Sequence, residues 1–357
     1  MTSSNYQHWK EQYEAEREKL IDALGRVVDG GIIEDIQHIG ATSVPDMPAF
    51  PCVDIGLAVW PFPLDAGPGS KMEALGYQIV EGYTGSPQQR FRHESGLFQL
   101  FIVEPGTGDW FDLVLMGDYL RHNDQVCEEV SSRKTDAALD KSAFFAEALP
   151  EAHKWWIGHY GFSQLEAIAN ELKEAPFPWF VAGGWALDLF LGHVQRVHYD
   201  VDVIVPRSAQ MDLQKYMTGQ GWKLITPYEK RLELWPPHMR LELPRHQVHA
   251  HRDDIFVDIL LTDMNEVWCY RREPVVVRTM EKMGLRSESG IPYLAPELVL
   301  LFKSKNTSNH ERAKDQMDFE RVVPYLELER RAWLHWALLA TAPGHQWIRQ
   351  LAGSLSS

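Results

Sequence analysis

A glycine pair followed by closely spaced aspartates is the feature that most restricts what this 357-residue chain can form. Gly183-Gly184 follows a short apolar run, Asp200 and Asp202 are separated by one residue in a predicted strand, and Asp258 lies in a later one. Residues two apart on a strand share a face, about 7 Å from one another, so both carboxylates are expected to point to one side. Carboxylates this close repel one another unless a cation lies among them.

These residue types together suit a magnesium and phosphate site. Mg²⁺ binds one or two carboxylates and takes substrate phosphates as further ligands. A glycine turn at the start of a helix offers phosphate its backbone N–H groups and the positive end of the helix dipole. A lone D-x-D or Gly-Gly is usually only a loop or a turn, so the prediction of metal-assisted nucleotidyl transfer rests on their order and spacing.

The sequence FVAGGWALDLFLGHVQRVHYDVDVIV (residues 180–205) extends the pattern. It resembles the 2″-type aminoglycoside nucleotidyltransferases and the lincosamide nucleotidyltransferases of the DNA polymerase β-like superfamily. Those families read G-G-W-A-h-D, then L-G, then R-x-H-x-D-h-D, where h is apolar. The matching residues are Gly183, Gly184, Trp185, Ala186, Leu187, Asp188, Leu191, Gly192, Arg196, His198, Asp200 and Asp202. The resemblance continues through FVDILL (residues 256–261) and the helical tail.

The resemblance implies a role for each of these positions. Asp200 and Asp202 would hold Mg²⁺, and Asp258 would be the third carboxylate, either a general base for the acceptor hydroxyl or a further metal ligand. The nucleotide would be bound by Gly183, Gly184, Arg196, Lys303 and Lys305, with Arg312 and Lys314 as weaker candidates. A hydroxyl of the acceptor would attack the α-phosphorus of ATP or another nucleoside triphosphate and release pyrophosphate. For Asp188 we expect only the stabilisation that a helix dipole gives to a carboxylate near the helix start.

The first part of the chain resembles the GrpB-like family, which is regarded as related to the same nucleotidyltransferases. The resemblance lies in HIGATSVPDMPAFPCVDI (residues 38–55), EPGTGDW (104–110) and DYLRHN (118–123). Only Asp54 remains on the predicted strand, with Gly56 expected where a second carboxylate would lie. A single carboxylate binds Mg²⁺ poorly, so we expect this unit to be catalytically degenerate. It would shape the acceptor pocket, bind a ligand, or pair subunits in a homodimer.

Both halves show helix, strand, glycine turn and Asp-bearing strand in the same order, which predicts two copies of one fold. We expect an α+β protein with two tandem nucleotidyltransferase-like domains, each a short mixed sheet flanked by helices. The domains would be 1–158 and 159–357, the second divided into a catalytic sheet (159–292) and a helical tail (293–357). In the tail, helices are predicted to begin near Pro296, Glu311 and Leu328, and the tryptophans Trp333, Trp336 and Trp347 are predicted to be core.

Charge and composition restrict the partners and the location. With 35 Lys+Arg against 50 Asp+Glu, the net charge of −15 disfavours nucleic acid and favours a small, polycationic acceptor such as an aminoglycoside. No apolar run is long enough to cross a membrane, and the charged N-terminal sequence is unlike a signal peptide. Three widely spaced cysteines suit a reducing cytoplasm. His246, His249 and His251 are read as partly exposed strand residues in preference to zinc ligands.

Two alternatives remain beside the small-molecule nucleotidyltransferase. One keeps the chemistry and changes the acceptor to a protein or a tRNA end, although the acidic charge disfavours tRNA. The other is a non-catalytic tandem protein that binds nucleotide as a sensor or scaffold, which the degenerate first unit favours. The carboxylates of the second unit argue against it, because like charges held together without a metal cost stability.

Overall fold

The computed structural model describes residues 3–47, 49–64, 66–80, 88–133, 141–229, 231–252, 255–304 and 313–355. The chain divides into two compact units, the first formed by 1–159 with 227–234 and the second by 160–226 with 235–357. The predicted boundary lay between residues 158 and 159. Among the described helices, none is long and apolar enough to cross a membrane.

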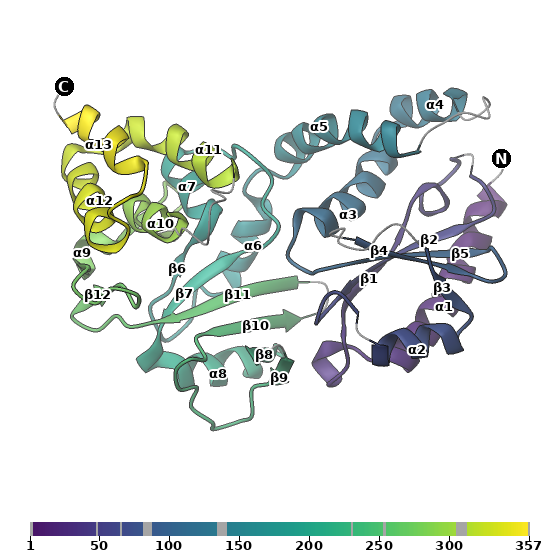
Figure 1. Cartoon of the computed structure of the whole chain (residues 1–357), viewed down its shortest axis with the longest axis horizontal. Coiled ribbons are helices and arrows are strands. Elements are labelled where there is room, and N and C mark those ends of the chain that lie inside the picture. Colours follow the sequence, from purple (N-terminus) through teal and green to yellow (C-terminus); the bar gives the residue numbers. More distant parts are fainter. Residues whose placement is uncertain are drawn as a thin grey trace. The chain divides into compact units, whose positions relative to one another are not determined.

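The first unit is built on a five-stranded sheet (Figure 1). Its elements are α1 (Ser3–Leu24), β1 (Ile33–Ile39), the short 3-10 helix η2 (Ala41–Ser43), β2 (Val53–Val59), α2 (Ala66–Ala74), β3 (Tyr77–Ile79), β4 (Gln88–His93), β5 (Phe98–Val103), α3 (Gly108–Arg121), α4 (Asp124–Arg133) and α5 (Lys141–Tyr160). The strand order is β1-β2-β5-β4-β3. Every residue of β2 is buried, as expected for a strand covered on both faces, and Leu20 and Leu24 of α1 belong to the same core.

From residue 160 onward, an eight-stranded sheet has the order β14-β15-β6-β7-β11-β10-β8-β9. The elements are α6 (Ser163–Glu171), β6 (Phe180–Val181), α7 (Gly183–Leu191), β7 (Asp202–Pro206), α8 (Gln210–Gly219), β8 (Lys223–Tyr228), β9 (Arg231–Leu234), β10 (Gln247–Arg252), β11 (Ile255–Thr262), β12 (Val267–Cys269), β13 (Val277–Thr279), α9 (Met280–Met283), β14 (Gly284–Arg286), β15 (Pro292–Leu294), α10 (Pro296–Lys303), α11 (Ala313–Val322), α12 (Leu328–Thr341) and α13 (Trp347–Leu355). The four C-terminal helices lie together, and α10 packs against α7 and α12 (Figure 1).

The two sheets share one core topology, which confirms the prediction of a repeated α+β fold. In the first unit β1 and β2 are antiparallel, β2 and β5 are parallel, and β4 and β3 continue antiparallel. In the second unit β6, β7, β11, β10 and β8 pair with the same directions in the same order. Because the strands correspond one to one, positions in the two units can be compared through their pairing registers.

The helical tail has one more helix than the sequence predicted. Helices α10 and α12 begin at Pro296 and Leu328 as expected, and α11 begins at Ala313. The additional helix α13 begins at Trp347, whose side chain is buried. Trp336 is 43% exposed, so its assignment to the core was wrong.

Candidate active site

Two of the three predicted carboxylates occupy paired positions on neighbouring strands. Asp202 is the first residue of β7, and Asp258 lies on β11, where the parallel register pairs it with Asp202. Paired residues on adjacent strands point to the same face of a sheet, with the strands about 4.8 Å apart. Asp258 is buried, and its Oδ2 accepts a hydrogen bond of 2.6 Å from the side-chain amide of Gln247.

The structure places Asp200 in a loop, whereas the sequence predicted it in a strand. The sequence placed Asp200 and Asp202 on one strand, but β7 begins only at Asp202, so Asp200 lies in the loop before it. The carbonyl oxygen of Asp200 accepts a hydrogen bond of 3.0 Å from the indole N–H of Trp185 on α7. Burial raises the pKa of Asp200, although nearby cations, Lys314 first among them, act against this shift.

Gly183 and Gly184 must be glycine because other residues pack too close to their Cα atoms to leave room for a side chain. Gly183 has a φ of +59°, and a Cβ added there would overlap Oδ2 of Asp202. A Cβ on Gly184 would overlap the guanidinium of Arg196 and the ring of His198. The sequence interpreted the pair as a turn with a phosphate-binding backbone. The structure adds that only glycine leaves room for Asp202 beside Gly183, and for Arg196 and His198 beside Gly184.

Asp188 has a different role from the one expected of a residue that only complements a helix dipole. It is fully buried, and its Oδ2 lies 2.7 Å from Nε2 of His198 and accepts a 3.1 Å hydrogen bond from the backbone N–H of Gln195. Its Oδ1 pairs with the guanidinium of Arg321 on α11 at 2.8 Å. Burial lowers the pKa of His198 to about 4, so the imidazole is neutral at pH 7 and donates to Asp188 through Nε2.

Arg196 and Lys303, both predicted to bind nucleotide, converge on Asp318 of α11. Arg196 donates from Nε and Nη2 to the two oxygens of Asp318, at 3.3 and 3.2 Å. Lys303 pairs with Asp318 and Asp315, both at 2.9 Å. The sequence did not single out Asp318 or Arg321 because no local motif links them to the D-x-D segment. Lys305 and Arg312 lie outside the described residues.

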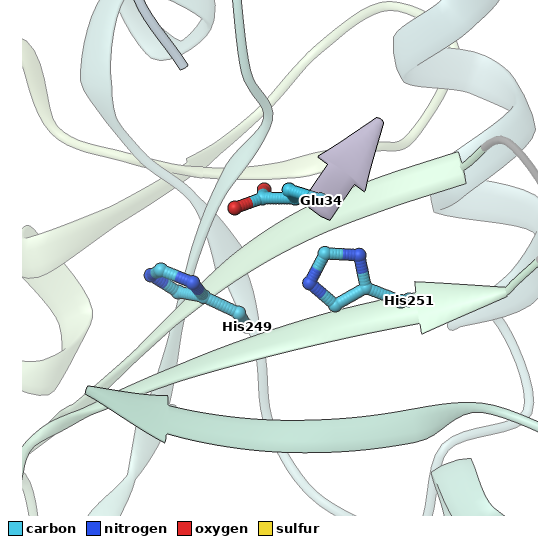
Figure 2. Close-up of side chains that lie close together, drawn as sticks. All are labelled: Glu34, His249 and His251. Carbon is cyan, nitrogen blue, oxygen red and sulfur yellow. The ribbon is translucent and has the colours of Figure 1, made fainter. Parts of the chain in front are cut away.

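Gln247 is a further residue that sequence reasoning missed. It lies on β10, beside β11, and a lone glutamine in a strand carries no motif signal. The neighbouring His249 and His251 share one side of β10, as predicted (Figure 2). Their ring centroids are 6.4 Å apart, and Phe256 packs against both rings, so they belong to an aromatic cluster.

Family models match both parts of the chain. Residues 3–148 match the model described as GrpB protein. Residues 164–321, which contain the carboxylates, the glycine pair and the Asp318 network, match the model described as Aminoglycoside-2''-adenylyltransferase. The two halves of the chain match two different families. The first is called the GrpB-like unit below, and the second the adenylyltransferase-like unit.

Individual relatives match parts of the chain. The chain is 32% identical over 114 residues to the UPF0157 protein SCO7215 of Streptomyces coelicolor, covering 32% of this chain and 56% of that protein. It is 28% identical over 150 residues to the UPF0157 protein YqkA of Bacillus subtilis, covering 41% and 42%. The chain thus spans about half the length of these curated relatives. The solved structure of the antibiotic-resistance factor ANT(2'')-Ia matches 54% of this chain and 94% of its own, with 15% identity and a TM-score of 0.35.

The GrpB-like unit keeps the glycine but has lost two of the three carboxylates. Gly40 has a φ of +70°, and a Cβ there would overlap Oδ2 of Asp54, just as Gly183 lies against Asp202. Asp54 is paired with Gln99 on β5, so Gln99 occupies the position of Asp258. Counting back two residues along the chain places Cys52 at the position of Asp200. The expectation that Gly56 marks the lost carboxylate was therefore wrong, because Asp54 corresponds to the second aspartate of D-x-D.

Proposed function

We propose that the adenylyltransferase-like unit is a magnesium-dependent nucleotidyltransferase. It transfers a nucleoside monophosphate from ATP, or another nucleoside triphosphate, to a hydroxyl of a small cationic molecule such as an aminoglycoside. The observation that carries this proposal is the pairing of Asp202 with Asp258 on neighbouring parallel strands, with Gly183 packed against Asp202. The match of residues 164–321 to the adenylyltransferase model supports the same chemistry.

The chemistry of the donor set suits Mg²⁺, although the carboxylate oxygens of Asp200, Asp202 and Asp258, all described residues, do not all lie within 4.8 Å of one another. Asp200, Asp202 and Asp258 offer carboxylate oxygens, the hard ligands that Mg²⁺ prefers, and Gly183 packs directly against Oδ2 of Asp202. Magnesium bound by these residues would neutralise charge on the phosphate oxygens and lower the barrier to attack at the α-phosphorus. The same cation would relieve the repulsion among the three carboxylates.

Side chains and backbone groups of the protein would perform the two remaining tasks, which are removal of the proton and binding of the triphosphate. Asp258 would take the proton of the acceptor hydroxyl, because a hydroxyl is a poor nucleophile until a base removes its proton, or would serve as a further metal ligand. The hydrogen bond from Gln247 to Oδ2 fixes the orientation of this carboxylate. The backbone at Gly183 and Gly184, with Arg196 and Lys303, would bind the triphosphate so that pyrophosphate leaves opposite the attacking oxygen.

A cationic acceptor follows from charge and from the family match. The chain has a net charge of −15, which attracts polycations and repels nucleic acid. The matched family model is named for adenylylation of aminoglycosides. We therefore place aminoglycosides first among the acceptors to be tested, with lincosamides second.

Mass spectrometry tests the proposal directly. The full chain is incubated with Mg²⁺, each nucleoside triphosphate in turn, and a panel of aminoglycosides and lincosamides. We expect one acceptor to gain the mass of a nucleoside monophosphate residue, and Asp200→Asn and Asp202→Asn to abolish the gain. Glu266→Gln, which removes an exposed carboxylate of the same unit, is the control and should retain activity.

The proposal is rejected if no acceptor gains a nucleotide and Asp200→Asn alters nothing measurable. Transfer of labelled nucleotide to a macromolecule in a cell lysate would instead identify the protein or tRNA acceptor. Nucleotide binding without any transfer would favour a sensor.

A further inference from the structure

The loop between α7 and β7 carries Asp200 ahead of the strand, and its last residue, Val201, is bonded to the sheet through its carbonyl oxygen, which accepts from the N–H of Asp258 at 3.0 Å. Residues 192–201 join the end of α7 to the first residue of β7. A residue within a strand is fixed by its ladder of hydrogen bonds, whereas a loop residue needs other contacts to hold one position. The position of Asp200 relative to Asp202 and Asp258 therefore depends on what anchors this loop.

Three contacts anchor the loop to the helices around it. Asp188 of α7 binds the imidazole of His198 at 2.7 Å and accepts from the backbone N–H of Gln195 at 3.1 Å. Trp185 binds the carbonyl of Asp200 at 3.0 Å. The third contact joins Arg196 to Asp318 through two hydrogen bonds. Asp318 lies 122 residues further along the chain than Arg196.

Asp318 connects these anchors. It is fully buried, and besides Arg196 it pairs with Lys303 of α10 at 2.9 Å and with Arg321 at 2.8 Å. Arg321 also pairs with Asp188, which joins the two carboxylates through one guanidinium. Loop, α7, α10 and α11 therefore share one ion network.

The ion network contains equal numbers of positive and negative side chains. Its carboxylates are Asp188, Asp315 and Asp318, and its cations are Arg196, Lys303 and Arg321, while His198 is neutral at pH 7. Buried ion pairs contribute little net stability compared with apolar packing, and their best-supported use is to fix one geometry. A self-neutralised network beside the D-x-D segment fits that use.

We propose that Asp318 is a positioning residue that holds the 192–201 loop, and with it Asp200, in the geometry that binds metal. Asp318 fixes Arg196 directly and reaches His198 through Arg321 and Asp188. The inference rests on the proposed function in one respect, namely that Asp200 is a metal ligand.

Mn²⁺ binding to the full chain, measured by electron paramagnetic resonance without nucleotide or acceptor, tests this inference. Asp318→Asn removes the carboxylate charge. Arg196→Lys keeps the charge but loses the two-bonded contact, because an ammonium cannot reproduce the planar guanidinium fork. We expect both variants to weaken Mn²⁺ binding by about 10-fold or more, the usual effect of losing a residue that orients a metal ligand.

Glu297→Gln is the matched control. Glu297 lies on α10, is fully buried, and pairs with Arg278 and Arg330, both at 2.7 Å. Losing this carboxylate disturbs a buried ion cluster of the same helical tail without touching the 192–201 loop. We expect its Mn²⁺ affinity to stay within about twofold of the unmodified protein, although its melting temperature falls as it does in Asp318→Asn.

The outcomes separate the inference from the proposed function. If the unmodified protein binds Mn²⁺ and Asp200→Asn removes that binding, but Asp318→Asn and Arg196→Lys bind normally, the positioning role is wrong. If only Asp318→Asn weakens binding, the cause is the lost charge, which also overturns the positioning role. If Asp200→Asn binds Mn²⁺ like the unmodified protein, the proposed metal site fails, and the inference with it. Should Asp318→Asn not fold, Arg196→Lys decides alone.

Discussion

Two glycines at opposite ends of α7 show how one residue type serves two purposes. Gly183 and Gly192 both have a positive φ, of +59° and +79°. Gly192 ends the helix in the left-handed conformation and would have open space around a Cβ. Gly183 faces Asp202 so closely that a Cβ would overlap its carboxylate. Of these two glycines, only Gly183 contacts an aspartate of the predicted metal site.

Gly183→Ala and Gly192→Ala should therefore separate backbone strain from site geometry. Both substitutions place alanine in a left-handed conformation, which costs about 1 kcal/mol. We expect Gly183→Ala also to displace Asp202 and to lower Mn²⁺ affinity and nucleotidyl transfer at least about 10-fold. Gly192→Ala should lose only stability, as measured by urea unfolding. Equal Mn²⁺ affinity in the two variants would contradict the role assigned to Gly183.

Asp318 should make the free energy of unfolding depend on pH in the acid range. Burial alone would raise its pKa, but Lys303, Arg196 and Arg321 together hold it at about 2, below the ordinary value of 3.8. As pH falls below 3.8 the unfolded chain binds this proton first, so the stabilising contribution is present above pH 3.8 and is lost down to about pH 2. That contribution is about 2 kcal/mol.

The measurement is the free energy of unfolding in urea between about pH 6 and pH 2.5, compared for the unmodified protein and Asp318→Asn. The difference between the two proteins should be constant near neutral pH and should narrow by about 2 kcal/mol toward the acid end. A difference that does not change with pH would show that the carboxyl has an ordinary pKa.

At the scale of elements, the helical tail shows where periodicity is informative and where it is not. The prediction located α10 and α12 from apolar spacing, but it grouped Trp333, Trp336 and Trp347 together as core. In the structure Trp347 begins α13 and stacks on Phe319 of α11, with ring centroids 4.3 Å apart. Its indole N–H also donates to Gln316 at 2.6 Å. Trp336 is half exposed on α12.

Trp347→Ala and Trp336→Ala form a matched test of this difference. Removing the buried Trp347 should cost about 3–5 kcal/mol, because the cavity cannot be refilled and α13 loses its contact with α11. Trp336→Ala should change the free energy of unfolding by less than about 1 kcal/mol. Urea unfolding checks both values, and similar losses would mean that α13 is not anchored through Trp347.

At the scale of the whole molecule, one fold occurs twice with different chemistry. The strand pairings correspond in both units, and so does the glycine that lies against an aspartate. The three acidic positions of the adenylyltransferase-like unit, Asp200, Asp202 and Asp258, have Cys52, Asp54 and Gln99 as counterparts in the GrpB-like unit. A site with one carboxylate binds Mg²⁺ more weakly than a site with three.

Asp54→Asn and Asp202→Asn, which change corresponding positions, should therefore behave differently. We expect Asp202→Asn to abolish Mn²⁺ binding and nucleotidyl transfer, while Asp54→Asn leaves the metal stoichiometry and the transfer rate within about twofold of the unmodified protein. Isothermal titration with Mn²⁺ and the transfer assay give the two readouts, and the melting temperature shows whether each variant is folded. A lower metal stoichiometry in Asp54→Asn would mean that the GrpB-like unit also holds a metal.

Local patterns were sufficient for much of the fold and for the carboxylates. Strands such as Phe98–Val103 follow from apolar runs, the end of α7 follows from Gly192, and the order of elements in each half predicted the repeated fold. Asp200, Asp202 and Asp258 were predicted as metal ligands because a metal site needs several carboxylates, and that role stays a prediction. Apart from Asp258, which lies 56 residues after Asp202, each of these signals depends only on residues close together in the chain.

Only the tertiary structure decided what surrounds those carboxylates. Asp318 reaches Arg196 of the 192–201 loop and Arg321 reaches Asp188 of α7, each across more than a hundred residues, and Gln247 reaches Asp258 from a neighbouring strand. Cys52 was recognised as the counterpart of Asp200 only through the strand register. Sequence patterns record the propensity and spacing of neighbouring residues, whereas a buried charge takes its partners from whichever distant elements the folded chain packs against it. The sequence alone therefore determined which acidic residues were candidates, and the packing of α7, α10 and α11 determined how they are held.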